Sequence, residues 1–104
     1  MDTPPSQDLP PTYECFEICR HETSGEVRTR GCGRRHRVPQ AAAKHGKSQF
    51  YPYLSSNQPF YQVALEVRDA EGRVALRFTR QCKWGKSSYA RWVPAREAAP
   101  ISSS

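Results

Sequence analysis

The chain is organised around one stretch of alternating residues, from Tyr61 to Trp84. Between residues 61 and 67 an apolar side chain occupies every second position, and the alternation resumes between residues 74 and 78. A period of two on both sides of a short segment ending in Gly72 predicts a β-hairpin. One face of this hairpin is apolar, and the other is polar and mostly basic.

The same pattern suggests a register for the hairpin. A three-residue loop would turn the apolar set of one strand towards solvent, because a shift of one residue reverses every side chain. We therefore expect a four-residue loop, residues 69–72, in which Gly72 supplies the left-handed conformation. The cross-strand pairs would then be Val67 with Val74, Leu65 with Leu76 and Val63 with Phe78.

The rest of the chain predicts a second hairpin and one short helix. Residues 12–21 have the composition of a strand, residues 22–25 that of a turn, and residues 26–30 that of a returning strand. Residues 38–46 predict about two helical turns, with Pro39 at the first helical position and Gly46 just past the end. The expected fold class is a small antiparallel β or α+β fold, made of two β-hairpins plus one short helix.

One domain is expected in a chain of 104 residues. We place it at residues 12–93, between an acidic, proline-rich leader (residues 1–11) and a tail rich in Ala, Pro and Ser (residues 94–104). Both terminal segments are expected to be disordered. The aromatic segment of residues 47–60 is interrupted by Pro52 and Pro59 and is expected to be extended, with the alternative of an edge strand.

The chemical state expected for the cysteines depends on the compartment in which the protein resides. The sequence has no apolar run near the ~20 residues of a membrane span, and its first residues lack the basic start and apolar stretch of a secretory signal. We expect a cytoplasmic or nuclear protein that is not secreted. Its four cysteines would then be thiols or metal ligands rather than disulfides.

The net charge of +6 is unevenly distributed. Residues 1–27 carry one arginine against six carboxylates, a net charge of −5, whereas residues 28–104 carry fifteen Lys and Arg against four carboxylates, a net charge of +11. A basic block of that size indicates a polyanionic partner, either nucleic acid or an anionic membrane surface. The alternative is a surface charge that only keeps the protein soluble.

Three groups of residues make up the expected nucleic-acid interface. Arginines of a glycine-containing loop have forked donors that suit phosphate. Cations at alternate positions of a strand are spaced at roughly 6–7 Å, like successive phosphates, and aromatic residues among cations can stack on bases. The groups are Arg28, Arg30, Arg34, Arg35 and Arg37; Arg73, Arg77 and Lys83; and Lys86, Tyr89, Arg91 and Trp92. Trp84 is in phase with the apolar face and is expected in the core, whereas Trp92 fits either role.

A zinc site is the alternative use of the Cys and His residues, since five of these seven residues fall between residues 15 and 36. The spacing lacks the tight C-x2-C pair of common zinc modules. Two cysteines four residues apart on one strand would lie about 13 Å apart at ~3.3 Å per residue, too far to share one zinc. The preferred ligand set is therefore Cys19, His21, Cys32 and His36, with Cys15 as a substitute. The simpler interpretation is ordinary thiols and no cofactor.

Catalysis has little support in the sequence. No phosphate-binding glycine motif, paired carboxylates or G-x-S-x-G motif is present, and Cys32 with His36 lacks a third group to orient the imidazole. We expect a non-enzymatic, basic, sequence-tolerant nucleic-acid-binding protein, with RNA preferred over DNA. By analogy of composition alone, it would be a small viral-type accessory protein that sequesters RNA.

Two alternatives remain open at this stage. The first is a protein–protein interaction module that uses an aromatic patch within residues 50–61 or an exposed strand edge. The second is a small zinc-binding regulatory protein. A homodimer is also attractive, because the edges of so short a sheet benefit from being covered.

Overall fold

The fold is a five-stranded antiparallel sheet with one helix, a small α+β domain, which confirms the expected class. The computed structural model describes residues 10–54 and 59–95. The strand order is β2-β1-β3-β4-β5. The elements are β1 (Tyr13–His21), β2 (Val27–Gly31), α1 (Pro39–Gln49), β3 (Phe60–Asp69), β4 (Val74–Lys83) and β5 (Tyr89–Pro94). Most of the two expected terminal segments lies outside the described residues.

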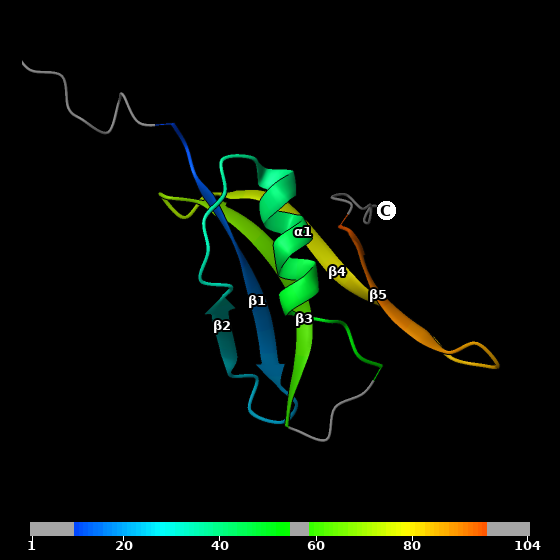
Figure 1. Ribbon diagram of the computed structural model, residues 1–104. Coiled ribbons are helices and arrows are strands. Elements are labelled where there is room, and N and C mark those ends of the chain that lie inside the picture. Colours follow the sequence, from blue (N-terminus) through cyan, green and yellow to red (C-terminus); the bar gives the residue numbers. More distant parts are fainter. Residues whose placement is uncertain (1–9, 55–58, 96–104) are drawn as a thin grey trace, which may run out of the picture.

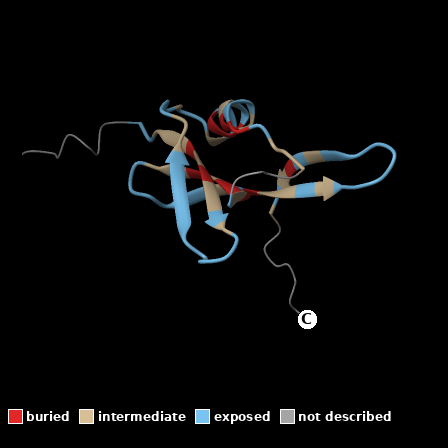
Figure 2. Cartoon of the chain, turned by 90° about the horizontal axis from the view of Figure 1, so that it is seen from below, coloured by how far each residue is buried: buried red, intermediate tan, exposed pale blue. Residues whose placement is uncertain are grey.

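The molecule has two layers. Helix α1 lies along one face of the sheet, mainly over β1 and β3, and none of the described residues forms a helix over the opposite face (Figures 1 and 2). Among the described residues, no helix is long and apolar enough to cross a membrane.

The helix is longer than the sequence suggested. It begins at Pro39 as expected but continues to Gln49, so Gly46 lies inside it rather than past its end. Its buried face consists of Ala42, Ala43 and Gly46. Because these side chains are so small, the helix backbone can approach the sheet closely. Gly46 packs directly against Cys15 of β1.

The core lies between the helix and the three central strands. Leu65 and Val67 of β3 are fully buried together with Cys15. Beyond the last turn of the helix, the larger rings fill the remaining space: Phe50, Phe78 and Trp92 belong to the same cluster of buried residues.

The register of the central hairpin differs from the prediction. Asp69 N–H donates to the carbonyl of Arg73, so the loop has three residues, 70–72. Val67 pairs with Leu76 and Leu65 with Phe78, while Arg68 pairs with Val74. Ala75 is therefore an extra residue in β4. This β-bulge offsets the shorter loop and keeps both apolar sets on the same face.

Gly72 adopts a positive φ of 87°, as the turn required. The first hairpin is also confirmed, with Glu17 opposite Arg30 and Cys19 opposite Arg28. β5 was not expected as a strand, because residues 85–93 lack a clear alternation.

Gly46→Ala tests the close contact between helix and sheet. A Cβ at this position would lie 2.5 Å from the Cβ of Cys15 and closer still to its Sγ. We expect the overpacking to lower the free energy of unfolding by about 1–3 kcal/mol, although glycine to alanine in a helix ordinarily stabilises by about 1 kcal/mol. Urea unfolding measures the change, and Ser48→Ala on the exposed side of the same helix is the control. A more stable Gly46→Ala protein would contradict the packing described here.

Candidate nucleic-acid interface

The outer ends of β4 and β5 form a two-stranded ribbon. The pairing of β4 with β3 ends at Thr79, whereas its pairing with β5 continues to Lys83. Among the described residues, residues 80–83 therefore pair only with residues 89–92. This unit, residues 80–92, is called the ribbon below. It extends past the helix and away from the rest of the sheet (Figure 1).

The loop at the tip of the ribbon is held by its own hydrogen bonds. Gly85 N–H donates to Ser88 Oγ at 2.9 Å, and the same hydroxyl donates to the Gly85 carbonyl at 2.8 Å. Gly85 has a φ of 144°, a conformation that a side chain would disfavour. Trp84 stands immediately before this loop with 64% of its surface exposed. The expectation that Trp84 belongs to the core was therefore wrong.

One face of the ribbon combines cations with an aromatic ring. Lys83 lies opposite Tyr89 and Gln81 opposite Arg91, so these four side chains share a face. Arg91 Nε donates to Gln81 Oε1 at 2.7 Å, and its guanidinium carbon lies 5.6 Å from the centre of the Tyr89 ring. The ribbon also carries Arg80 and Lys86 and contains no Asp or Glu in its sequence.

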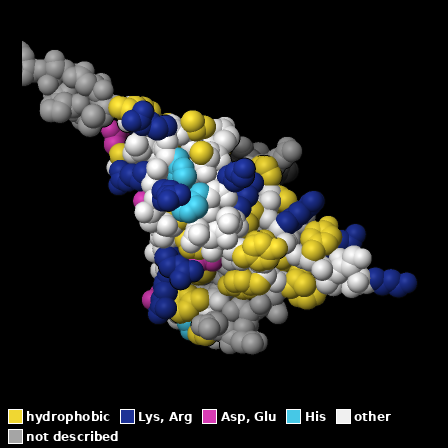
Figure 3. All heavy atoms as spheres, in the orientation of Figure 1, with side chains coloured by type: hydrophobic (Ala, Val, Ile, Leu, Met, Phe, Trp, Pro, Cys, Tyr) yellow, Lys and Arg dark blue, Asp and Glu magenta, His cyan; other side chains and the backbone are white. Residues whose placement is uncertain are grey.

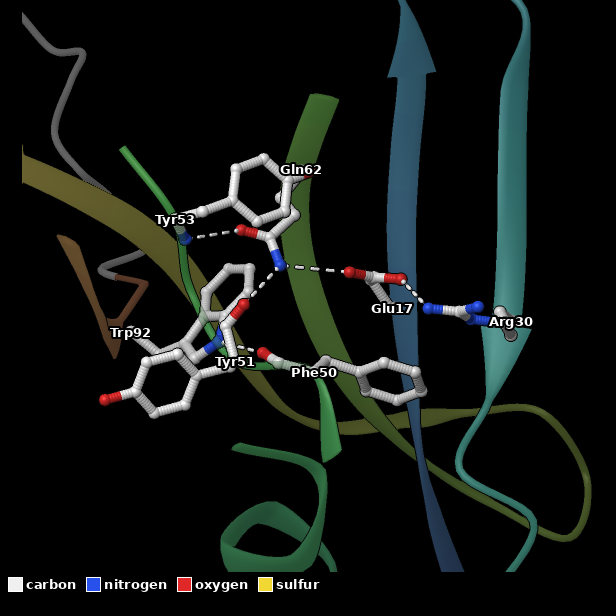
Figure 4. A network of polar contacts seen from close by, with 7 residues as sticks. All are labelled: Glu17, Arg30, Phe50, Tyr51, Tyr53, Gln62 and Trp92. Atoms are coloured by element: carbon white, nitrogen blue, oxygen red, sulfur yellow. Dashed lines mark hydrogen bonds and ion pairs between the residues drawn. The ribbon is translucent and has the colours of Figure 1, made fainter. Parts of the chain in front are cut away.

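Trp92 is a core residue and not a stacking platform. Only 8% of its surface is exposed, and its Nε1–H donates to the carbonyl of Phe50 at 2.8 Å (Figure 4). The expected role of Trp92 in binding nucleic acid is corrected accordingly. Alternation gives the face on which Trp84 and Trp92 lie, but it does not show that the core covers Trp92 and stops short of Trp84 at the tip.

A buried polar network fixes the segment that follows the helix. Gln62 Nε2 donates to Glu17 Oε2 at 3.0 Å and to the Tyr51 carbonyl at 2.9 Å, and Tyr53 N–H donates to Gln62 Oε1 (Figure 4). The other carboxylate oxygen of Glu17 accepts from Arg30 at 3.1 Å. Glu17 and Gln62 are both buried, and these partners satisfy them.

Several of the predicted phosphate ligands are paired with carboxylates. Arg30 lies against Glu17, and Arg77 Nε lies 3.2 Å from Glu66 Oε2. Near the central turn, Arg73 contacts both Asp69 and Glu71. Arg28 lies 3.6 Å from Glu26 and also stacks on Phe60. Each of these four arginines therefore has a carboxylate beside it that offsets its charge towards a phosphate.

The glycine-containing loop is partly engaged as well. Glu14 Oε2 accepts from Gly33 N–H at 2.9 Å, and Arg35 Nε lies 4.0 Å from the other oxygen of Glu14. Arg34 and Arg37 are exposed and have no ion pair with any carboxylate in residues 10–54 and 59–95. Only these two arginines of the loop remain fully available to a phosphate.

The sequence reasoning missed two cations on the helix. Lys44 and Lys47 are three positions apart on α1 and therefore lie on the same side of the helix. Lys44 is exposed, and Lys47 Nζ lies 4.1 Å from the centre of the Phe78 ring. The three-residue spacing could have revealed them. On the face of the molecule that carries the helix, Lys and Arg side chains are widely spread, whereas Asp and Glu side chains are seen mainly along one edge (Figure 3).

The fold separates the expected zinc ligands. Cys32 N–H donates to the Cys15 carbonyl, and His36 pairs with Tyr13, so both lie beside the first half of β1. Cys19 and His21 lie at the other end of this strand, about 13 Å or more away at ~3.3 Å per residue. The described part of the chain contains no group of three or more His, Cys, Asp or Glu residues arranged to hold a metal, even with Cys15 as the substitute.

The histidines have other surroundings instead. The Nδ1 of His21 accepts from the N–H groups of Thr23 and Ser24 at 3.2 and 3.1 Å and so stabilises the first turn. The rings of His36 and His45 lie 5.3 Å apart, tilted by 55°. The Nε2 of His36 and the Nδ1 of His45 are buried and find no hydrogen-bond partner among the described residues.

Comparison with known protein families, with curated proteins and with solved structures finds no match for this chain.

Two tryptophan variants test the assignment of core and surface. Trp92→Phe leaves the buried carbonyl of Phe50 without its donor, so we expect the free energy of unfolding to fall by about 1–3 kcal/mol. Trp84→Phe alters an exposed ring and should change it by no more than about 0.5 kcal/mol. Equal losses in urea unfolding would show that the two residues have been assigned wrongly.

Thiol reactivity provides a further test. Burial, reinforced by the negative charge of Cys32, raises the pKa of Cys15 from 9.0 to about 12. Burial, together with Glu17, raises the pKa of Cys19 to about 11. At pH 8 the folded protein should therefore protect both thiols from iodoacetamide, while the chain in urea should react at both, as mapped by peptide mass.

The same shifts predict how stability depends on pH. Below pH 9 both thiols are protonated in the folded and the unfolded chain. As the pH rises from 9 towards 12, the unfolded chain releases these protons first, so their stabilising contribution is progressively lost. A free energy of unfolding that rose over this interval would contradict the burial of Cys15 and Cys19.

Proposed function

We propose that the protein is a non-enzymatic nucleic-acid-binding protein that prefers RNA, tolerates many sequences, and acts in the cytoplasm or nucleus. The observation that carries this proposal is the separation of paired from unpaired cations. Carboxylates of the described residues pair with arginines of β2, β3, β4 and the central turn, and with Arg35 of the loop before α1. Apart from Arg20 on β1, the described cations without such a partner lie in the loop before α1, on α1 itself and on the ribbon.

The revised interface differs from the one expected from the sequence. It consists of cations of the loop before α1, of α1 and of the ribbon that have no carboxylate partner among residues 10–54 and 59–95, together with the exposed rings of the ribbon. Arg20 on β1 and Arg80, which donates to the Tyr53 carbonyl, are not included. Its members are Arg34, Arg37, Lys44, Lys47, Lys83, Trp84, Lys86, Tyr89 and Arg91. A surface of this charge attracts phosphates without reading base edges, which is why the proposed binding tolerates many sequences.

The salt dependence of binding tests this proposal. We expect affinity for a fluorescent single-stranded RNA to fall with salt, with a slope that counts the phosphates contacted, at about 0.7 per contact. The variant Arg34→Gln, Arg37→Gln, Lys44→Gln should flatten that slope by about 2. The control variant Arg73→Gln, Arg77→Gln removes two arginines that are already paired and should flatten it less.

The outcomes are distinct. Binding that shows no salt slope, or that both variants weaken equally, would refute the proposed division of the cations. If no RNA or DNA binds, the proposal fails as a whole. The alternative of a protein-interaction module then rests on Tyr51, which is 77% exposed, and Tyr51→Ala would test it by loss of partner capture.

A further inference from the structure

The exposure of aromatic rings on the ribbon has no explanation within the fold. Trp84 is 64% exposed and Tyr89 is 39% exposed. Burial of a large apolar side chain contributes about 1.5–3 kcal/mol to stability; most of that contribution is lost at Trp84 and a smaller part of it at Tyr89. Yet the tip loop is fixed by the hydrogen bonds between Gly85 and Ser88, so the rings are held on a defined framework.

The charges beside these rings indicate what kind of ligand would cover them. Lys83 and Tyr89 are directly opposed across the ribbon, and Lys86 lies in the tip loop. The ribbon contains no acidic residue, so any ligand that covers it should be anionic. Arg91 donates through Nε to Gln81, which orients its guanidinium beside the Tyr89 ring and leaves the terminal nitrogens free to donate to a phosphate.

The composition of the tip distinguishes nucleic acid from a membrane surface. A hairpin that inserts into a bilayer interface presents an apolar end, with its cations set back from it. Here the residues beyond Trp84 are Gly85, Lys86, Ser87 and Ser88, and they place a charge and two hydroxyls at the extremity. A hydrated ligand that alternates apolar faces with negative charges fits this arrangement better.

Aromatic side chains also discriminate between paired and unpaired bases. In a duplex both faces of each base are stacked on its neighbours, so a ring on a protein has no free face to cover. A two-stranded ribbon can enter the major groove of B-form DNA, but the corresponding groove of an RNA duplex is too narrow and deep. Groove recognition also relies on hydrogen bonds to base edges, whereas Trp and Tyr rings suit the exposed faces of unpaired bases.

We propose that the ribbon is a binding element for single-stranded nucleic acid, in which Trp84 and Tyr89 stack on unpaired bases while Lys83, Lys86 and Arg91 contact the flanking phosphates. This inference rests on the proposed function and adds to it the class of ligand, single strands over duplexes. The loop before α1 and the helix supply contacts to phosphates alone.

The test compares ligands that share a backbone but differ in their bases. The full-length protein is titrated into three fluorescent probes: a 12-nucleotide single-stranded RNA of mixed sequence, a ribose-phosphate strand of the same length without bases, and a 12-base-pair RNA duplex. We expect the single strand to bind about tenfold or more tightly than either of the other probes, since each stacked base contributes substantially to affinity.

The variant Trp84→Ala, Tyr89→Ala should lose this preference. Its affinity for the base-bearing strand should fall about tenfold or more, its affinity for the strand without bases should not change, and its salt slope should stay that of the wild type. Tyr51→Ala, which removes an even more exposed ring elsewhere, is the matched control and should bind as the wild type does. Because neither ribbon ring belongs to the buried core cluster, urea unfolding should show that the double variant still folds.

Fluorescence gives an independent readout. The chain has two tryptophans, and Trp92 is buried, so stacking on Trp84 should quench only the exposed component of the emission. Trp84→Phe should remove that quenching while Trp92 continues to report an intact fold.

The failures of the two proposals are distinguishable. If the double ribbon variant binds all three probes as the wild type does, with the same salt slope, the ribbon inference is wrong while the proposed function stands. If no probe binds, both fall together. If vesicles containing phosphatidylserine bind and depend on Trp84 while the strands with and without bases bind equally, the ribbon is a membrane contact and the inference is also wrong.

Discussion

The close approach of α1 to β1 sets the dimensions of the whole domain. Only hydrogen atoms separate the backbone at Gly46 from the side chain of Cys15, and the neighbouring helix positions are alanines. The helix therefore contributes little apolar volume of its own, and one short element covers β1 and β3. A chain with 37% hydrophobic residues can form a packed core in this way, but the core does not reach across all five strands.

The position of β1 inside the sheet determines which charged residues are paired. β1 is a central strand that carries Glu14 and Glu17, and the fold places Arg30 and Arg35 against these carboxylates. The acidic beginning and the basic remainder of the chain thus partly neutralise each other within the domain. What is left is a smaller positive surface than the composition suggests, located mainly on the helix, the preceding loop and the ribbon.

Local patterns located most of the elements but not β5 or the boundaries. Composition located β1, alternation located β3 and β4, and the glycine turns located two hairpins. Alternation did not locate the bulge at Ala75, because an extra residue in a strand does not change the composition. The bulge becomes favourable only because the loop has three residues and the apolar side chains of both strands must still face the core. The end of the helix was misjudged for a related reason, because Gly46 resembles a helix terminator until its contact with Cys15 is known.

The candidate site was harder to predict than the fold. The sequence shows where the arginines are, but which of them remain unpaired depends on carboxylates that are distant in sequence, such as Glu17 for Arg30 and Glu66 for Arg77. That Trp92 lies in the core and Trp84 at the surface also depends on residues distant in sequence. A phase along a strand gives the face on which a ring lies, and only the tertiary structure determines whether anything covers that face.

The two-stranded structure of the ribbon also limits its rigidity. An isolated pair of strands is marginally stable in water, and residues 80–83 have no third strand beside them among the described residues. The free energy of local opening should therefore decrease along β4 from Phe78, which is buried, towards Lys83, so that the outer amide hydrogens exchange with solvent well before those of the core. A ligand held at the tip binds only the closed form, and its apparent affinity is lowered by the fraction of molecules in which the ribbon is frayed.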